Sequence, residues 1–480
     1  MADEADLHRE NEALKAENAS LKREVTELKR RIADLESAIR KLGAQLKMNS
    51  TNSSMPPSTD LARGRLLKRL LRKPTGRKRG GQPGHEGVTR ELFPAEDLDH
   101  VVELLPERCR DCRARLKGAG TLADLHQVVE VPPAAAEVTE YRRYRIGCVC
   151  GATTTAALPE DVPATCVGPR LQAVLTTLTG RYRLSRREAQ EVVVSLYGPK
   201  AEVALGTIFA LEKRSSKALA GVYEEALSAV RQAEAVHLDE TGWREAKRKA
   251  WLWGAITRTL SVFRIDRHRS AEAYHALMGE DYSGDIQTDR WVSYHAHPKT
   301  RRGLCWAHLK RDFKALTELG HKGAARIGNA GLRAEAAVTR AYRRHLNGEI
   351  AHASLRPLLQ EERCRLQRVL AWGSASTERK AAALCHDVLK RYTSLWTFTR
   401  HEGVEPTNNR AERGLRKAVL WRKGSFGSDS PEGSRFAERM LTVSESLRAQ
   451  GRSVLDFVET AIRSHAVGKP HPSLLPLNSS

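Results

Sequence analysis

AVHLDET at 235–241 opens a series of short apolar runs that decides the fold. The others are, in chain order, AWLWGAI (250–256), LSVFRID (260–266), SGDIQTDR (283–290) and RGLCWAH (302–308). Turn residues separate these runs, and a helical stretch follows residue 267. Strand, strand, strand, helix, strand, helix, strand is the order expected of an α/β layer with a mixed sheet.

Two of these strands end in an acidic residue, Asp239 in HLDET and Asp289 in IQTDR. A carboxylate at the end of a core strand is costly unless something binds it, and a divalent cation is the usual partner. Glu412 in TNNRAERGLR is a third candidate, on a helix expected to start near Thr407 or Asn408. Two aspartates and a helix glutamate can hold two Mg²⁺ ions about 4 Å apart for phosphoryl transfer on DNA or RNA. Spacing alone does not single these three out, because the chain has 58 Asp and Glu.

Leucines recur every seven residues at the N-terminus, at Leu7, Leu14, Leu21, Leu28, Leu35 and Leu42. If these are d positions, the a positions are Asn11, Asn18, Val25, Ile32 and Ile39. That pattern favours a two-stranded parallel coiled coil, and buried asparagines fix its register. Charges at the g and e positions agree, because Glu10–Lys15, Glu17–Lys22, Glu24–Lys29 and Arg31–Glu36 are all of opposite sign. Residues 1–48 are therefore predicted to form a dimerising leucine zipper.

Residues 49–95 read as a linker and a basic arm. The Ser, Asn and Pro run MNSTNSSMPPSTD cannot continue a helix, and residues 61–80 carry nine cations and no acid. We expect phosphate contacts from this run, in particular from Arg69, Arg72, Lys73, Arg77, Lys78 and Arg79. A basic region that follows the zipper after a linker argues against a bZIP protein. A solvated charge run with no fixed partner is the alternative.

Two cysteine pairs lie in residues 96–165, as Cys109-Arg-Asp-Cys112 and Cys148-Val-Cys150. Four thiolates at this separation predict a zinc ribbon, in which one structural Zn²⁺ replaces a core too small to form alone. The second pair is one residue shorter than the usual knuckle. Two alternatives therefore remain: the thiols are free and buried, or His126 replaces one of them as a ligand. The other four cysteines are single, and eight in all are too few for a disulfide framework.

The remaining segments are mostly helical by pattern. Residues 166–232 have apolar positions at spacings of three and four, with Ser185 and Glu188 as a capping box, and suit either a helix-turn-helix-like DNA-binding unit or plain helical packing. Residues 306–400 also read as helical. The Pro- and Ser-rich tail at 465–480 is expected to be disordered.

Five motifs together resemble the DDE transposases of bacterial insertion sequences, in particular the IS-sixty-six family. They are HLDETGWR (237–244), WLWGAIT (251–257), TDRWVSY (288–294), CWAHLKRDF (305–313) and NNRAERGLRK (408–417). The resemblance extends over nearly the whole chain and includes the zipper, the GGQPGHEG segment, the cysteine pairs and the stretch at 422–442.

The resemblance implies an RNase H-like core over 233–464 whose catalytic acids are Asp239, Asp289 and Glu412. It places Asp239 on the first strand, Asp289 after the fourth and Glu412 on a late helix. Because Asp289 and Glu412 are 123 residues apart (412 − 289), a helical insertion is expected at about 315–400. The implied reaction is cleavage at the transposon end by a water activated by Mg²⁺ or Mn²⁺, followed by attack of the freed 3′-hydroxyl on target DNA.

Other residues near these motifs have less defined roles. His308 and Arg311 are expected to orient DNA near the metals, and Arg410 and Arg413 to hold the scissile phosphate, each against a structural alternative. Trp243, Trp291 and Trp306 could stack on an extruded base, although packing is the commoner role. Cys305 and His308 form C-x-x-H, but no second pair accompanies them, so no zinc site is predicted there.

Composition sets the class of protein. Eighty Lys and Arg against 58 Asp and Glu give a net charge of +22, which indicates a polyanionic partner such as double-stranded DNA. No apolar run is long enough to cross a bilayer and the first residues are polar, so a cytoplasmic, nucleoid-associated bacterial protein is expected.

In fold class, the sequence predicts a multidomain α+β protein: parallel coiled coil, zinc ribbon, helical unit and RNase H-like core with a helical insertion. The partners expected are transposon-end and target DNA, a second copy of the chain and small accessory proteins. The rival interpretations are a catalytically inactive, transposase-derived DNA-binding protein or repressor, and a metal nuclease that cuts without joining.

Overall fold

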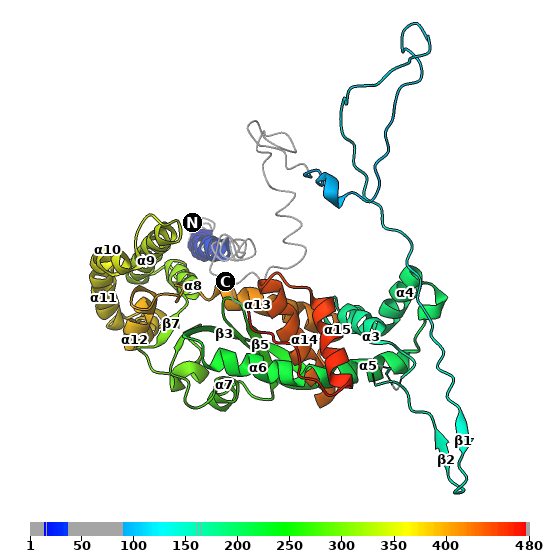
Figure 1. Cartoon of the computed structure of the whole chain (residues 1–480). Helices are drawn as coiled ribbons and strands as arrows, with labels where there is room; N and C mark the ends of the chain where they lie inside the picture. Colours follow the sequence, from blue (N-terminus) through cyan, green and yellow to red (C-terminus); the bar gives the residue numbers. More distant parts are fainter. Residues whose placement is uncertain (1–13, 16, 37–89, 161, 164, 477–480) are drawn as a thin grey trace, which may run out of the picture.

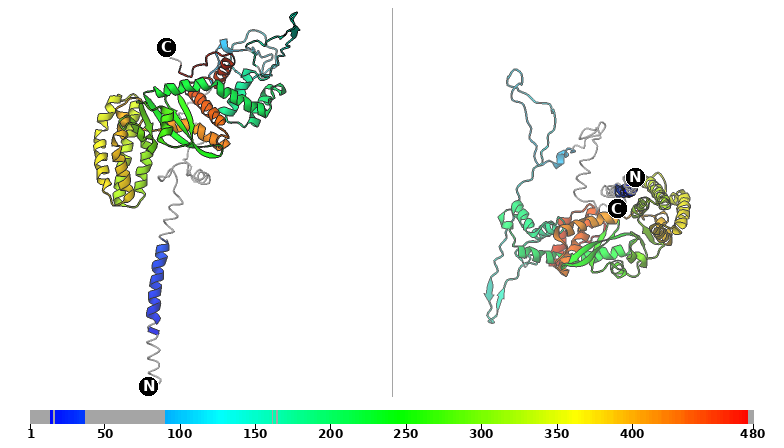
Figure 2. Two further views of the ribbon diagram at one scale, coloured as in Figure 1. Left: turned by 90° about the horizontal axis from the view of Figure 1, so that it is seen from below. Right: turned by 180° about the vertical axis from the view of Figure 1, so that it is seen from behind.

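The structure is a computed structural model that describes residues 14, 15, 17–36, 90–160, 162, 163 and 165–476. Leu7, Leu42 and the six cations assigned to the basic arm lie outside these residues. Figures 1 and 2 show a helical stalk at the N-terminal side, an extended region and a folded body that contains the sheet.

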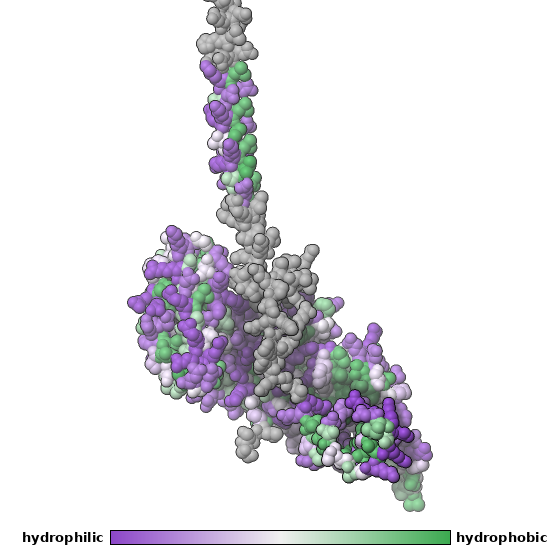
Figure 3. Space-filling view, turned by 90° about the horizontal axis from the view of Figure 1, so that it is seen from above, coloured by the Kyte–Doolittle hydropathy of each residue, from purple (hydrophilic) through white to green (hydrophobic). Residues whose placement is uncertain are grey.

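The stalk is helical over residues 14, 15 and 17–36, as the heptads predict. Its heptad side chains form one apolar line along the helix, visible in green in Figure 3. All of the described ones are exposed, including Leu21 at 50% and Leu28 at 48%. This apolar line is what a coiled-coil partner would bury; the partner itself stays a prediction.

Residues 90–160 have little regular structure. They contain η2 (Ala95–Asp97) and a short antiparallel pair, β1 (Arg145–Gly147) with β2 (Thr153–Thr155). The rest of this region is extended backbone that reaches away from the body in two long excursions (Figure 1).

A helical unit joins this region to the sheet. It comprises α3 (Pro169–Gly180), α4 (Arg186–Tyr197), η3 (Pro199–Ala201), α5 (Leu205–Ala218) and α6 (Ala220–Arg231). The predicted capping box is present: Glu188 N donates to Ser185 Oγ (3.2 Å) and Ser185 N to the Glu188 carboxylate (2.7 Å). A small apolar core that includes Leu175, Val193 and Leu211 holds α3, α4 and α5 together.

The body is built on a five-stranded mixed sheet with the order β5-β4-β3-β6-β7. Its strands are β3 (Ala235–Glu245), β4 (Arg248–Ile256), β5 (Ser261–Asp266), β6 (Asp285–Thr288) and β7 (Arg302–Leu304). β4 runs antiparallel to its neighbours β3 and β5, and β6 and β7 run parallel to β3. The predicted strands all form, but the segment between β6 and β7 is the short 3₁₀ helix η4 (Val292–Ala296) rather than an α-helix.

Helices cover both faces of the sheet. One face, with Leu238 and Trp253, packs on α6 and on α7 (Ala271–Met278). The other, with Leu252 and Phe263, packs on α13 (Asn409–Ser425) and α14 (Pro431–Ala449). Because side chains alternate along a strand, Leu238 enters the first core and Asp239 points toward the face of α13.

β5 is an edge strand of the sheet, and polar side chains of α14 accept hydrogen bonds along its free edge. Backbone N–H groups of Ser261, Phe263 and Ile265 donate to Ser446 Oγ (2.9 Å), Thr442 Oγ1 (3.1 Å) and Glu438 Oε1 (2.6 Å). Four helical residues advance about 6.0 Å and two strand residues about 6.6 Å, so the two spacings match. The edge is thereby unavailable for pairing with another strand.

Residues 306–400 form the predicted helical insertion between β7 and α13. Its elements are α8 (Trp306–Thr317), α9 (Lys322–Leu346), η5 (His352–Ser354), α10 (Leu355–Leu358), α11 (Gln360–Ser374), α12 (Arg379–Lys390) and η6 (Tyr392–Thr399). α9 packs closely on α8, because a Cβ on Gly331 would lie 2.2 Å from the Phe313 ring. The insertion has its own core, with Trp306, Phe313 and Trp396.

The C-terminal segment does not follow the prediction of disorder. α15 (Val454–Ala466) packs on the body, and Leu474 beyond it is fully buried. Glu225 accepts from Leu474 N (2.7 Å), and Gln450 donates to the Leu474 carbonyl (2.9 Å). The prediction is therefore wrong for residues 465–476: proline limits local structure, but backbone groups and one leucine still find tertiary partners.

Among the helices of the described residues, none combines the length and the apolar character that a membrane span requires.

Candidate active site

Asp239 lies in the middle of the sheet, on β3, and is half-buried. Burial raises the pKa of its carboxyl well above the usual range, and the negative charges of Glu240, Asp289 and Glu412 raise it further. Asp289 and Glu412 thus lie close enough to act on the charge of Asp239, although the carboxylate oxygens of the three acids do not all lie within 4.8 Å of one another. Removal of that repulsion requires a proton or a cation.

Asp289 follows the end of β6, in a loop that an arginine holds in place. Its Oδ1 accepts from Trp291 N (2.8 Å). Arg302, an almost fully buried cation, donates to Thr288 Oγ1 (3.0 Å) and to the Asp289 carbonyl (2.9 Å). Burial lowers the pKa of this guanidinium to about 10, so it is still charged at neutral pH. Arg302 therefore fixes the backbone of the loop and leaves the Asp289 carboxylate facing the site.

Glu412 lies in the first turn of α13, and Asn408 joins that turn to β3. Asn408 is buried; its Nδ2 donates to the Leu238 carbonyl (2.7 Å) and its Oδ1 lies 3.3 Å from His237 Nδ1. Burial lowers the pKa of His237 to about 4, so the ring is neutral and can donate to Asn408. Asn408 N donates to the sulfur of Cys305 (3.1 Å). One side chain thus sets the position of the helix of Glu412 relative to the strand of Asp239.

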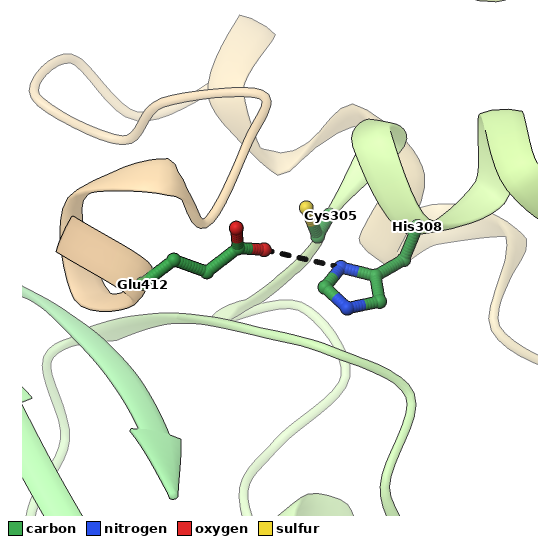
Figure 4. Close-up of side chains that lie close together, drawn as sticks. All are labelled: Cys305, His308 and Glu412. Carbon is green, nitrogen blue, oxygen red and sulfur yellow. Dashed lines mark ion pairs between the residues drawn. The ribbon is translucent and has the colours of Figure 1, made fainter. Parts of the chain in front are cut away.

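Cys305, His308 and Glu412 form a compact group whose sulfur, nitrogen and oxygen atoms lie within 4.8 Å of one another (Figure 4). His308 Nδ1 is 3.7 Å from Glu412 Oε1. Burial, and then the charge of Arg311, lower the pKa of His308. Burial raises the pKa of the Cys305 thiol, whose sulfur is already the acceptor for Asn408 N. The C-x-x-H pair thus does gain a third possible metal ligand, Glu412, which the sequence alone did not reveal.

A buried acid next to Asp239 has fixed partners of its own. Glu240 accepts hydrogen bonds from Arg269 (Nε, 2.6 Å) and from the hydroxyl of Tyr294. Arg269 also stacks on Trp291 at 3.7 Å and lies 3.9 Å from Asp289 Oδ2. It is a cation that faces both the half-exposed aromatic ring and the second catalytic candidate.

The residues expected to contact DNA have different surroundings. His308 and Arg311 both belong to α8. His308 lies beside Glu412 of α13, and Arg311 is half-buried. Arg410 is paired with Glu405 (3.0 Å), whereas Arg413 is exposed. Of the three tryptophans, Trp243 and Trp306 are buried and donate to Ser428 and Leu395, and Trp291 is exposed. Only Trp291 is placed to stack on a base.

The two cysteine pairs each form a turn, but they do not meet. Cys109 N donates to the Ala114 carbonyl (2.8 Å) and Cys148 N to that of Ala152 (2.7 Å). Hydrogen bonds from within its own pair lower the pKa of each first thiol, Cys109 and Cys148. Among the described residues, the Cys305 group alone brings three potential ligands together. The zinc ribbon stays a prediction.

Sequence reasoning missed Asn408, Arg302, Arg269 and Glu240. Asn408 and Glu240 lie inside motifs that were recognised for their neighbours, and Arg302 is the first residue of β7 and of the run RGLCWAH. Their importance depends on partners as far away as Leu238, 170 residues from Asn408. No local pattern marks such a pair.

Comparison with known proteins assigns the body of the chain to a family. A family model described as "Transposase IS66 family" matches residues 186–436, about half of the chain and the whole of the site. A second, described as a family of unknown function (DUF6444), matches residues 3–91. An uncharacterized protein of Sinorhizobium fredii, y4qI, is 25% identical over 279 residues, which are 51% of this chain and 50% of that relative. The chain thus spans about half the length of that curated relative.

Proposed function

Because this chain belongs to the IS66 family of transposases, we propose that it binds the terminal repeats of an insertion sequence, cuts the DNA there and joins the freed ends to target DNA. The single observation that carries the proposal is that the charges of Asp289, after β6, and Glu412, at the start of α13, both raise the pKa of the buried carboxyl of Asp239 on β3. The strand order β5-β4-β3-β6-β7 supports an RNase H-like core beneath them.

The donor set fits a hard divalent cation, because carboxylate oxygens are the ligands that Mg²⁺ prefers. The raised pKa of Asp239 supports the same conclusion, since it reflects negative charge that a cation would offset. Bound there, two Mg²⁺ ions would activate the attacking oxygen and stabilise the leaving oxygen. Arg302 fixes the loop that carries Asp289, and Asn408 fixes the start of the helix that carries Glu412. Arg269 offers a positive charge beside Asp289.

We further propose that two copies associate through the N-terminal heptads. The exposed apolar line through Leu21, Val25 and Leu28 supports this, as do the opposite charges at g and e. Leu21→Lys at a d position should give monomers in light scattering, because it places charge in the seam. Ser20→Lys, the adjacent outer position, adds the same charge and should stay dimeric. Dimers from both variants would contradict the zipper.

The catalytic proposal is tested by end cleavage and strand transfer on the element's own terminal DNA with Mg²⁺ or Mn²⁺. We compare the wild type with Asp239→Asn, Asp289→Asn and Glu412→Gln, and measure DNA binding in parallel. Glu402→Gln, at an exposed acid outside the site, is the matched control. The three variants should bind DNA and fail to cut it, and the control should cut.

Other outcomes lead to the rival functions. Binding without cleavage by the wild type, even with neighbouring accessory proteins added, would support a DNA-binding protein or repressor. Cleavage without joining would support a metal nuclease. Cleavage by one of the three variants would mean that this acid was misassigned.

A further inference from the structure

The longest helix of the insertion carries a line of cations on its outer face. Lys322, Arg326, Arg333, Arg340 and Arg344 of α9 are all exposed. At about 100° per residue, their spacings of four, seven, seven and four keep them within roughly 40° of arc. From Lys322 to Arg344 the line is about 33 Å long, at about 1.5 Å per residue. It forms a straight basic stripe, the α9 stripe, which nothing in the catalytic site explains.

The opposite side of α9 explains why the stripe faces outward. Small and apolar residues there, including Gly328 and Gly331, pack against Phe313 and Thr317 of α8. The one acid of α9, Glu335, also lies on that buried side, where it pairs with Lys310 of α8 (2.9 Å). The packing therefore fixes the rotation of α9 and leaves the stripe without an acidic residue of its own helix.

The stripe is also poorly neutralised by the rest of the molecule. Within the part of the chain that the structure describes, Arg333 and Arg340 have neither an ion pair nor a hydrogen bond. Arg326 stacks on Trp372, and Arg344 has one exposed partner, Glu349 (3.3 Å). Elsewhere in the insertion the pattern differs: Arg365 of α11 is bonded to both Glu361 and Glu362. Charge repulsion along α9 is thus left for an external anion to relieve.

Two geometric facts identify the anion. The length of the stripe is close to one turn of duplex DNA, about 34 Å. The insertion also reaches the catalytic acids through α8, whose His308 lies 3.7 Å from Glu412, and the stripe is on the side of α9 that is turned away from α8. A duplex with a phosphate at the acids therefore contacts the stripe by passing around the outer side of the insertion.

We propose that the α9 stripe binds the phosphate backbone of the duplex that is being cleaved. In naming DNA as the partner, this inference rests on the proposed function. The contacts would be electrostatic and independent of base sequence, as arginine contacts to phosphates are. The insertion is then a clamp that orients the duplex while the acids act on it.

The test is the salt dependence of binding of the full chain to a fluorescent end duplex, measured by anisotropy. Arg333→Gln/Arg340→Gln should lower the slope of log affinity against log salt by about two, because each arginine–phosphate pair adds close to one to that slope. Arg379→Gln/Lys380→Gln, exposed cations at the start of α12, make the same charge change in the same insertion and should leave the slope unchanged. Equal slopes for the wild type and the α9 pair, or equal decreases in both pairs, would overturn the proposal.

Two further arms separate the remaining explanations. Arg333→Lys/Arg340→Lys keeps the charge and should restore the slope; a failure to do so would mean that packing, not charge, was disturbed. An α9 variant that binds and cuts ends normally but joins them poorly would assign the stripe to target DNA and overturn this assignment. If the wild type binds and never cuts, the catalytic proposal fails while the slopes still decide the stripe.

Discussion

The sheet-centred body and the extended region at 90–160 reach order in different ways. In the body, distant segments hold one another: Asn408 bonds to Leu238, and the Trp306 indole to the Leu395 carbonyl. In the extended region most bonds are local, and apolar side chains such as Val101 and Val131 are exposed at 73% and 81%. A segment that buries so little apolar surface cannot be stable alone, so it needs a metal, a partner chain or DNA.

The largest expected difference between the two regions is in how their stability responds to the removal of zinc. If Cys109, Cys112, Cys148 and Cys150 bind one zinc ion, chelation should unfold the extended region and leave the melting of the body unchanged. The effect should be large, because a structural zinc ion contributes apparent binding free energies on the order of 10 kcal/mol. The measurement is limited proteolysis with zinc analysis, and Cys148→Ser should reproduce the chelated state.

Cys364→Ser is the matched control for that experiment, because Cys364 is exposed and far from either pair in sequence. Absence of bound zinc from natively purified protein would contradict the ribbon. The contrast would then point to a macromolecular partner for the region.

Within the body, Asp239→Asn should separate activity from stability. If Asp239 holds a metal ion as proposed, cleavage should fall on the order of a thousandfold, because loss of such a ligand costs several kcal/mol. Stability without divalent ions should rise, because burial and the neighbouring acids oppose the charge of Asp239. Thermal melting checks this: Mg²⁺ should raise the Tm of the wild type and change that of the variant less. If, in the absence of divalent ions, the variant melted at a lower temperature than the wild type, this would contradict the predicted repulsion between Asp239 and the neighbouring acids.

The closed edge of β5 should give the body a pH dependence that a solvated region lacks. Burial raises the pKa of Glu438 from 4.5 to about 7. Between those values the folded state holds a proton that the unfolded state has released, so stability falls as pH rises through that window. The full difference is about 3 kcal/mol for this shift. We expect the Tm of the wild type, relative to Glu438→Gln, to decrease from pH 4.5 to 7.

Glu432→Gln, at an exposed position on the first turn of the same helix, is the control. The Tm of the wild type relative to Glu432→Gln should show no such decline between pH 4.5 and 7. A difference between wild type and Glu438→Gln that is constant with pH would mean that Glu438 keeps an ordinary pKa.

The smallest test compares one substitution in both regions. A Cβ on Gly331 would lie 2.2 Å from the Phe313 ring, whereas one on Gly147 of β1 would meet nothing within 4 Å. Gly331→Ala should therefore cost about 1–3 kcal/mol through overpacking, and Gly147→Ala close to nothing. Chemical denaturation measures both; equal effects would mean that α8 and α9 pack less tightly than this distance indicates.

Local sequence carried much of the site but not its supports. Asp289 could be identified because it follows the strand β6, and Glu412 because it lies in a motif at a helix start. Asp239 was expected at the end of its strand, but β3 continues beyond it to Glu245. Arg302, Asn408 and Arg269 could not be identified, since each acts through partners far away in the chain. The Pro-rich tail misled for the same reason: Leu474 is buried, and its backbone bonds to Glu225 of α6 and to Gln450 before α15.

By itself, the sequence determined what depends on short-range periodicity: the heptads of the stalk, the strands of the sheet, the helices of the insertion and the order of the three acids. Side chains within one turn or one pleat suffice for such patterns. Only the tertiary structure decided which residues meet: the Asn408 link between strand and helix, the Cys305, His308 and Glu412 group, and the outward face of α9. Those contacts depend on how the remote segments pack, which no local window of the chain contains.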